Sequence, residues 1–572
     1  MNAERLLAHY ERIADAPDAN ARLRRFILDL AVRGKLVPQN SSDEPASELL
    51  KRIAKEKARL VKADEIRDKP SLPNVANTDM PFPIPLAWEW VRFANIVDFS
   101  AGRTPSRNDM SFWNTGDHAW VSISDMEDGQ VLTTTKETVS DKARERVFGS
   151  EPESPGTILM SFKLTIGKIA RLGLPAFHNE AIISIRPHLA ELDAYLFKIL
   201  PQFAQQGDTK GAIKGATLNR DSISNILFPL PPLAEQHRIV AKVDELMALC
   251  DRVETARVSR EAVRDRLAAA SLARLNAPDP ETFQADARFA LAALPALTTR
   301  PDQVKQLRQT ILNLAVRGKL VPQNPDDEPA SELLNRIAKE IPLSKAGTPT
   351  AEPPAYDAPR GWVWTRLGEL VAHSDAGWSP KTQDHPRSGS EWGVLKVSAV
   401  SWDRFRAWEN KQVLPGTEPR LQAEVKQGDF LISRANTAEL IARAVLVDEP
   451  PIKLMMSDKI VRLHLSADCC HRYVWIVNNY ADFAREHYVR HASGVSPSMK
   501  NVSRDVILSL PFPLPPLAEQ HRIVAKVDAL MVLCDRLEAS LTAAAATRRR
   551  LLDALLAEAL APAKDRELEA AE

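Results

Sequence analysis

Cysteine is scarce in this sequence, and two further absences narrow the class of protein. The four cysteines (Cys250, Cys469, Cys470 and Cys534) have neither the spacing of a zinc site nor that of a disulfide framework. No run of 18 consecutive apolar residues is present, so we expect no membrane span. The first 17 residues are charged and amphipathic rather than apolar, which predicts no secretory signal and a cytoplasmic protein.

The sequence also lacks an excess of charge of either sign. Its 75 Lys and Arg balance 75 Asp and Glu, which argues against a freestanding, non-specific nucleic-acid binder, because such proteins are usually basic. The distribution is uneven, since 161–220 and 451–504 each carry eight basic residues against four acidic ones. Each segment is either ordinary solvated surface or a patch that faces phosphate.

Catalytic motifs are missing as well. The chain has no N/D-P-P-Y/F motif or glycine loop of a DNA methyltransferase, and no G-x(4)-G-K-S/T phosphate loop. Glu424-Val425-Lys426 fits the nuclease E-x-K triplet, but such triplets often arise by chance. His237 and His521 have no Cys or His cluster nearby in the sequence, so capping or a partner contact is favoured over metal binding. We therefore predict no catalytic residue and no metal ligand.

What the sequence does contain is a duplication with a step of 284 residues. Residues 23–56 and 307–340 differ at only six of 34 positions, and 229–254 and 513–538 differ at three of 26. We call these segments the repeated blocks. The sequence between them, 87–228 and 361–512, does not repeat closely, and we call these segments variable blocks 1 and 2. Two nearly constant repeated blocks around two different variable blocks indicate one scaffold that presents two different recognition domains.

The repeated blocks predict helices. Leu23 to Ala31 has helical apolar spacing with Gly34 as a stop, and Asp43 precedes a second short helix. Prolines at 231 and 232 suit the start of a long helix to about Leu275, whose apolar stripe breaks at Arg257. The second copy keeps its stripe longer. Two such seams favour intramolecular coiled-coil pairing, although a long helix in a bundle would bury the same stripe.

The variable blocks mix short β-like runs with turns and resemble each other faintly. WEWVRF at 88–93 matches WVWTRL at 362–367, and PGTILMSFKLTIGKIARLG at 155–173 parallels QGDFLISRANTAELIARAV at 427–445. Proline-rich linkers precede both blocks. We predict two α+β domains of one fold whose surfaces have diverged.

These features resemble the specificity subunit of type I restriction–modification systems, in its longer form. The resemblance covers essentially the whole chain and is carried by the PLPPLAEQ-x-RIVAKVD and GKLVPQ-x(3)-DEPASELL-x-RI motifs, each found twice, with the W-x-W entries and the GTILMSF…HNEAIISI run. It implies an α+β fold in which two α/β target recognition domains are separated by a long antiparallel two-helix coiled coil, as a pseudo-twofold internal repeat. The implied parts are a helical region (1–65), a proline-rich linker (66–86), recognition domain 1 (87–228), a central helical region (229–340), a second linker (341–360), recognition domain 2 (361–512) and a C-terminal coiled-coil helix (513–572).

The resemblance also implies function and partners. Such a subunit is non-catalytic and reads a bipartite, asymmetric site in double-stranded DNA, one half with each recognition domain. It docks two methyltransferase subunits and the restriction/translocase subunits. No cofactor belongs to this chain, because S-adenosylmethionine for adenine N6 methylation is bound by the methyltransferase, and ATP and Mg²⁺ by the restriction subunit. No membrane takes part.

Candidate DNA contacts come from basic and polar residues in turns of the variable blocks, where each could equally be solvated surface. In block 1 they are Arg103, Thr104, Ser106, Arg107, Lys163, Thr165, Lys168, Lys210, Lys214, Thr217 and Asn219. In block 2 they are Lys381, Arg434, Asn436, Lys459, Ser496, Ser498, Lys500 and Asn501.

Candidate docking residues are the polar positions that the repeated helix start preserves in both copies. They are Glu235, Gln236, His237, Arg238 and Lys242 with Glu519, Gln520, His521, Arg522 and Lys526. Either they bind the methyltransferase subunits, or the duplication is recent and has not drifted. Two rival functions stay open, a coiled-coil scaffold whose variable domains bind proteins and a self-contained nuclease or modification enzyme.

Overall fold

The structure, a computed structural model, describes most of the chain. It covers residues 15–16, 18–163, 165–204, 210–212, 215–217, 219–279, 281–340, 355–401, 404–449, 452–494 and 499–560. The chain divides into two compact units: unit 1 comprises Met1–Ser259 with Ala545–Glu572, and unit 2 comprises Arg260–Ala544. None of the helices in the described ranges is long and apolar enough to cross a membrane.

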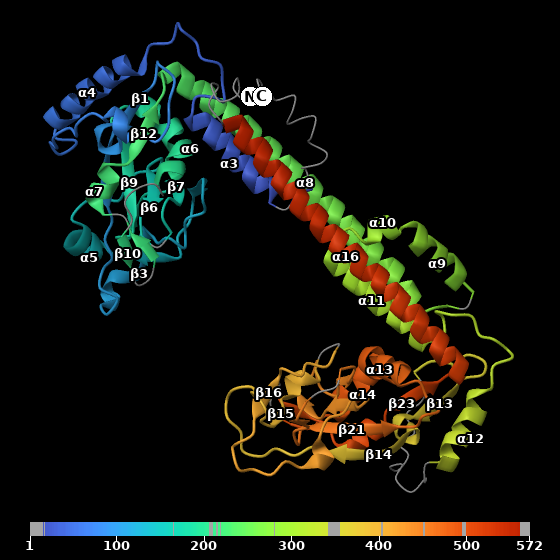
Figure 1. Cartoon of the computed structure of the whole chain (residues 1–572). Helices are drawn as coiled ribbons and strands as arrows, with labels where there is room; N and C mark the ends of the chain where they lie inside the picture. The colour runs from blue at the N-terminus through green and yellow to red at the C-terminus, as the bar shows by residue number, and fades with distance from the viewer. Residues whose placement is uncertain are drawn as a thin grey trace. The chain divides into compact units, whose positions relative to one another are not determined.

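Unit 1 begins with the two short helices that the repeated block predicts (Figure 1). Helix α3 (Ala19–Val32) ends before Gly34, whose φ of +65° favours glycine. Helix α4 (Ala46–Lys62) follows Pro45 and buries Leu49 and Ile53 on one face. The predicted stop and start are confirmed.

Variable block 1 folds into two sheets with helices beside them. The five-stranded sheet has the order β2 (Val97–Ala101), β9 (Ile182–Pro187), β6 (Ile158–Ser161), β7 (Ile169–Leu172), β4 (Gln130–Leu132). The three-stranded sheet has the order β5 (Glu137–Val139), β3 (Trp113–Val121), β8 (Ala176–His178). The other elements are α5 (Asp141–Ala143), α6 (Asp193–Ala204), the hairpin β10 (Lys210–Ala212) with β11 (Gly215–Thr217), and α7 (Arg220–Ser224). Every side chain of β6 is buried, as expected for a central strand.

Unit 2 repeats this plan with changes in its sheets. Helices α11 (Pro301–Val316) and α12 (Ala330–Glu340) precede variable block 2, and α9 (Phe283–Ala292) and α10 (Leu294–Leu297) precede those. The main sheet has the order β14 (Val371–Ala376), β21 (Ile460–Leu465), β17 (Phe430–Ser433), β19 (Ala444–Leu446). Two smaller sheets are β16 (Asn410–Gln412), β15 (Gly393–Leu395), β20 (Leu454–Met455), and β18 (Ala435–Asn436) with β22 (Lys500–Asn501). Helices α13 (His471–Tyr480), α14 (Asp482–His491) and α15 (Arg504–Leu508) complete the block. The mixture of helices and sheets in both units confirms the α+β prediction.

Each variable block is closed by a pair of antiparallel strands at its two ends. In unit 1, β1 (Glu89–Arg92) pairs with β12 (Leu227–Leu230), and in unit 2, β13 (Val363–Arg366) pairs with β23 (Pro511–Leu514). The register is equivalent, since Trp90 faces Pro229 and Trp364 faces Pro513. The chain therefore enters and leaves each block at one place, where a long helix begins.

The two long helices match the sequence prediction in length. They are α8 (Leu233–Asn276) and α16 (Leu517–Leu560). In unit 1, α3 packs on the first half of α8 through Ile27 and Cys250, and its Arg22 pairs with Asp553 of α16. In unit 2, α11 packs on the first half of α16, where Val304 and Ile311 cover Cys534. The short helices thus cover part of each apolar stripe, a contact that the sequence did not predict.

Candidate nucleic-acid interface

A buried carboxylate joins the start of each long helix to the variable block before it. Glu235, only 1% exposed, accepts a hydrogen bond from the Trp88 indole at 2.9 Å and another from the Gln39 amide at 2.5 Å. Burial raises the pKa of Glu235 above its ordinary value, although both hydrogen bonds oppose that shift. The carboxylate therefore ties a repeated block, a variable block and α8 together.

Unit 2 contains the same arrangement. Glu519 accepts from the Trp362 indole at 3.0 Å and from Gln323 at 3.3 Å, and burial again raises its pKa. Each tryptophan lies close to a glycine of positive φ, Gly34 beside Trp88 and Gly318 beside Trp362. A Cβ on either glycine would clash with the proline three residues before the tryptophan. We call this arrangement the junction.

Two more of the repeated polar residues belong to the junction. Gln236 is fully buried and donates to the Pro231 carbonyl at 2.9 Å, and Gln520 donates to Pro515 at 3.0 Å. A third repeated side chain makes an ion pair, since Arg238 lies 2.6 Å from the buried carboxylate of Asp43. In unit 2, Arg522 makes the same contact with Asp327, also at 2.6 Å.

The structure therefore divides the candidate docking residues. Glu235, Gln236, Glu519 and Gln520 are buried within their own units, and the two arginines are half-buried in ion pairs. His237, His521 and Lys526 are exposed, and Lys242 is half-buried beside Glu245 at 2.9 Å. The strict repetition of the buried pairs has a structural reason that the sequence analysis missed. The sequence did contain a signal for this contact. Both copies have a tryptophan at the start of the variable block and a glutamate in the first turn of the long helix.

In variable block 1, the four candidates that follow β2 all make contacts within the block. Arg107 pairs with Glu137 at 2.5 Å and stacks over the Trp113 ring at 3.8 Å. Arg103 donates to the Val147 carbonyl at 2.5 Å, and the Thr104 hydroxyl donates to Glu180. Ser106 is exposed, and its carbonyl accepts from Trp113. These side chains form an ordered basic and polar edge rather than a loose loop.

The remaining block 1 candidates lie on other segments. Lys163, Thr165 and Lys168 occupy the turn between β6 and β7, as expected, with Thr165 exposed and the Lys168 ammonium 3.4 Å from the Ile123 carbonyl. Lys210 and Thr217 face each other across the β10–β11 hairpin, and Lys214 lies outside the described residues. Asn219 caps α7 by accepting from the Ser222 amide at 2.7 Å, so its carboxamide oxygen already has a local structural role.

A cavity of about 490 Å³ in unit 1 adds basic residues that the sequence analysis did not select. Its cationic lining comprises Arg67, Lys69, Arg103, Arg186 and Arg220. Asp98 and Glu65 also line it, and Lys69 pairs with Asp98 at 2.5 Å. Residues 66–86 were predicted to be only a linker, yet Arg67 and Lys69 line the same cavity as Arg103, which follows β2.

In variable block 2, five of the eight candidates come together. Asn436 on β18 pairs in register with Lys500 on β22, Arg434 precedes β18, and the Arg434 amide donates to the Lys459 carbonyl at 2.8 Å. Asn501, on β22 next to Lys500, is exposed. A hollow of about 240 Å³ beside them is lined by Ser401, Asn436 and Lys459 among others. This cluster combines charge with groups that can donate and accept hydrogen bonds.

The other three block 2 candidates are not part of this cluster. Lys381 is exposed and lies across from Leu414, on the segment after β14. Ser496 and Ser498 lie outside the described residues.

Known proteins decide which family this architecture belongs to. Residues 85–260 match the family model for the type I restriction modification DNA specificity domain. The specificity subunit of the Escherichia coli type I restriction enzyme EcoEI is 34% identical over 562 residues, which cover 94% of this chain and 93% of that protein. The chain belongs to the type I restriction enzyme specificity subunits. The EcoAI specificity subunit, also from Escherichia coli, is 30% identical over 93% of this chain and 92% of its own length.

A solved structure also aligns with this specificity subunit. The HsdS subunit from Thermoanaerobacter tengcongensis covers 84% of this chain and 98% of that chain at 19% identity, with a TM-score of 0.41. Family membership rests on the two sequence relatives.

A specificity subunit recognises DNA sequence and is a non-catalytic component of its enzyme. The predictions of a DNA-recognition role and of a non-catalytic subunit are therefore confirmed. At the E-x-K triplet the backbone is held in place, since the Glu424 carbonyl accepts from Arg462 at 2.9 Å and the Lys426 amide donates to Asp429 at 2.8 Å. Type I specificity subunits are in general free of cofactors.

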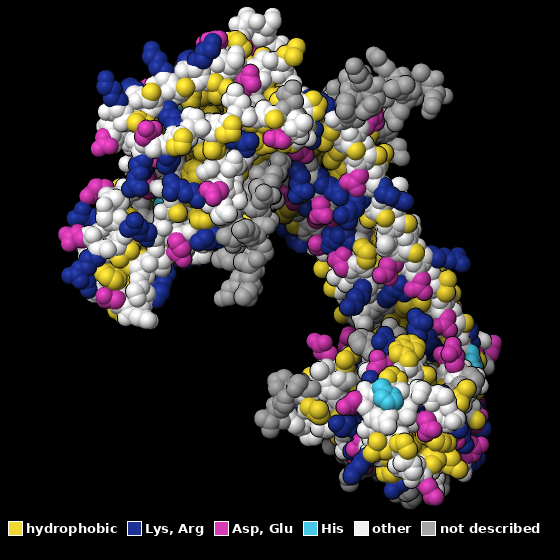
Figure 2. Space-filling view, turned by 60° about the vertical axis from the view of Figure 1, so that its left-hand side comes forward, with side chains coloured by type: hydrophobic (Ala, Val, Ile, Leu, Met, Phe, Trp, Pro, Cys, Tyr) yellow, Lys and Arg dark blue, Asp and Glu magenta, His cyan; other side chains and the backbone are white. Residues whose placement is uncertain are grey.

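The surface of this specificity subunit carries mixed charge. Figure 2 shows Lys and Arg side chains interspersed with Asp and Glu on the face in view. This agrees with the formal net charge of zero. Basic residues such as Arg107 and Arg186 also have acidic partners at 2.5 Å. Phosphate contacts made by these residues must therefore compete with ion pairs inside the protein.

Proposed function

We propose that variable blocks 1 and 2 are target recognition domains that read the two halves of a bipartite, asymmetric DNA site. The observation that carries the proposal is that the junction is the same in both units while the surfaces of the blocks differ. Each block is fixed to a long helix by the same Trp, Glu and Gln contacts. Two different variable blocks held by equivalent junctions fit an asymmetric DNA target, since nothing requires the two half-sites to match.

In this proposal α8 and α16 form the antiparallel coiled coil that spaces the two domains. Each helix has 44 residues, which corresponds to a length of about 66 Å. The domain bounds that we propose are helical regions 1–65, 229–340 and 513–572, linkers 66–86 and 341–360, and recognition domains 87–228 and 361–512. A fixed spacing makes the second half-site contact effectively intramolecular, but only at a matching separation and helical phase.

DNA contacts in domain 1 come from the ordered edge at Arg103, Thr104, Ser106 and Arg107, the Lys163–Lys168 turn, and the segment from Lys210 to Asn219. In domain 2 they come from the cluster around Asn436 together with Lys381, Ser496 and Ser498. Phosphate contacts position the domain and contacts to base edges specify the sequence. The Asn436 cluster is the stronger candidate for base reading, because the exposed carboxamide of Asn501 can both donate and accept at a base edge. The Asn436 carboxamide itself donates to Ser401 at 2.8 Å and accepts from the Thr437 amide at 2.9 Å.

Two methyltransferase subunits dock on the repeated helix starts, one on each copy, and the restriction subunits join that complex. S-adenosylmethionine, ATP and Mg²⁺ are then bound by those partners. Since Glu235, Gln236 and their copies are buried, docking uses the exposed His237, His521 and Lys526 and the half-buried Lys242, Arg238 and Arg522. The double variant Lys242→Glu and Lys526→Glu is expected to lose methyltransferase in a pull-down, while its unfolding midpoint stays unchanged. Retention of both subunits would contradict this docking surface.

Mapping methylated adenines in the host genome tests the reading function. The expected result is one asymmetric motif with two specific halves and a fixed gap. Replacing block 2 with that of a relative should change one half and keep the other half and the gap. A change in both halves, or no DNA retention in a mobility shift with the methyltransferase, would sink the proposal.

A further inference from the structure

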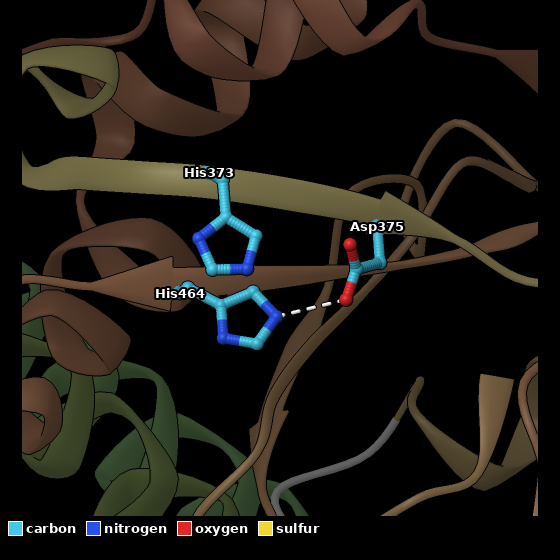
Figure 3. A group of neighbouring side chains, drawn as sticks. All are labelled: His373, Asp375 and His464. Carbon is cyan, nitrogen blue, oxygen red and sulfur yellow. Dashed lines mark hydrogen bonds and ion pairs between the residues drawn. The ribbon is translucent and has the colours of Figure 1, made fainter. Parts of the chain in front are cut away.

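We infer that variable block 2 contains a binding site for a divalent transition-metal ion of the Zn²⁺ class, formed by His373, Asp375 and His464. This site goes beyond the proposed function, and its test is independent of DNA reading. Figure 3 shows both imidazole rings and the carboxylate gathered at one place on paired strands. The potential ligand atoms of the three side chains all lie within 4.8 Å of one another.

The strand register brings the ligands together. His373 on β14 faces His464 on β21, and Asp375 lies two residues further along β14 on the same side. The two rings stack with centroids 3.7 Å apart and an interplanar angle of 13°. Since an imidazole lone pair lies in the ring plane, the exposed His373 ring must rotate for both rings to bind one ion. Because β14 and β21 are paired along this stretch, all three positions are fixed by strand pairing rather than by a loop.

The chemistry of the three groups suits a borderline-soft cation. Imidazole nitrogens and a carboxylate oxygen are common ligands of zinc and its neighbours, and three protein ligands leave a position for water. The His464 Nε2 atom lies 2.9 Å from Asp375 Oδ2, so the two atoms already share a proton that a metal ion would displace. His373 is exposed, and His464 and Asp375 are about one third exposed, which leaves the site open to ions from solvent.

Two groups lie close to the carboxylate of Asp375. It accepts a hydrogen bond from His464 and lies beside the guanidinium of Arg462. Arg462, 3.3 Å from Asp375, is itself paired with Asp429 at 2.9 Å, so its charge is shared between two acids. The site therefore offers an ionised ligand beside two imidazoles.

The equivalent strands of unit 1 have different chemistry. Strands β2 and β9, both fully described, contain no histidine. Their Ser100 and Ser184 hydroxyls lie 2.8 Å apart instead. The metal site thus belongs to variable block 2 and not to the duplicated scaffold, and a bound ion would fasten edge strand β14 to β21.

Zn²⁺ titration of the untagged full-length chain, followed by calorimetry and thermal unfolding, tests this inference. We expect one saturable site and a higher unfolding midpoint with Zn²⁺. His373→Ala and His464→Ala should each abolish the saturable binding, and Asp375→Asn should weaken it. The matched control is His118→Ala, because His118 pairs with Asp141 at 2.8 Å without a second histidine, and it should bind Zn²⁺ like the parent chain.

Co²⁺ substitution provides a second measurement, since the spectrum distinguishes nitrogen and oxygen ligands from thiolate. The competing candidate is the vicinal pair Cys469 and Cys470, although burial raises the pKa of the Cys469 thiol to about 12. A visible ligand-field spectrum without a near-ultraviolet thiolate band is expected. A thiolate band that disappears in Cys470→Ser, or unchanged Zn²⁺ binding in both histidine variants, would overturn the inference.

Discussion

The junctions and the sheets of the two units have diverged to different degrees. At the junctions the same side-chain contacts recur, with Glu235 and Glu519 accepting from tryptophan at 2.9 and 3.0 Å. On the paired strands β14 and β21, unit 2 carries the stacked His373 and His464, whereas β2 and β9 of unit 1 contain no histidine. A buried polar contact cannot change one partner at a time without loss, whereas an exposed face can. The junction contacts that hold the variable blocks are therefore retained, whereas the exposed surfaces of the blocks change in sequence.

The largest expected effect comes from removing the junction tryptophan. Trp88→Ala should lower the free energy of unfolding of unit 1 by about 3–5 kcal/mol, because it leaves a cavity and takes a partner from buried Glu235. Trp362→Ala should do the same in unit 2, as measured by denaturant unfolding. If only one variant were destabilised, the two junctions would not be energetically equivalent.

Removing the junction arginine should have a smaller effect. Arg238→Ala leaves the carboxylate of Asp43, which is 7% exposed, without its ion-pair partner, and should cost about 1–3 kcal/mol. Arg522→Ala is its matched copy beside Asp327. Arg257→Ala, whose partner Glu254 is more exposed, serves as the control and should cost under about 1 kcal/mol. Equal losses in all three variants would contradict a special role for the junction pair.

The pH dependence of the unfolding free energy should show whether the two junction carboxyls, Glu235 and Glu519, contribute equally. Burial raises the folded-state pKa of Glu235 and Glu519 above the ordinary 4.5. The stability that the protonated carboxyls contribute is present below the unfolded pKa and is lost as pH rises through the folded one. Glu235→Gln with Glu519→Gln should therefore flatten the decline in unfolding free energy just above pH 4.5. An unchanged pH profile would show that these groups do not titrate in that window.

The smallest effects on stability should come from the reading surfaces. Arg107→Ala breaks an exposed ion pair with Glu137 and should change stability by less than about 1 kcal/mol. If Arg107 contacts phosphate, the variant should weaken DNA binding and reduce the salt dependence of log K by roughly one unit. Lys459→Ala is the counterpart in variable block 2. Both are measured by mobility shift with the methyltransferase at several salt concentrations, and an unchanged salt slope would remove the residue from the interface.

The sequence predicted local elements better than contacts between them. Apolar spacing and Pro232 placed the start of α8 at Leu233, and Gly34 marked the end of α3. The β-like segments 155–173 and 427–445, which the sequence showed to be parallel, contain β6 and β17. These features depend on neighbouring residues, so a pattern within one segment is enough to reveal them.

The missed features depend on residues far apart in the chain. Glu235 looked like a surface residue in the first turn of a helix, but Trp88, 147 positions earlier, buries it. The His373–His464 pair required the register of β14 against β21, including an irregularity after Val371. Arg67 was assigned to a linker because composition alone does not reveal that its segment lines a cavity with Arg103.

The strand pairs β1–β12 and β13–β23 have a consequence for how this protein tolerates change. The first and last strands of each variable block are hydrogen-bonded to each other, so the block is attached to the repeated helices at one place. Block 2 is ten residues longer than block 1, yet both begin and end in the same register. Insertions inside a block therefore do not shift the long helix that follows. We therefore expect that a whole block can be exchanged between relatives without displacing the start of the long helix.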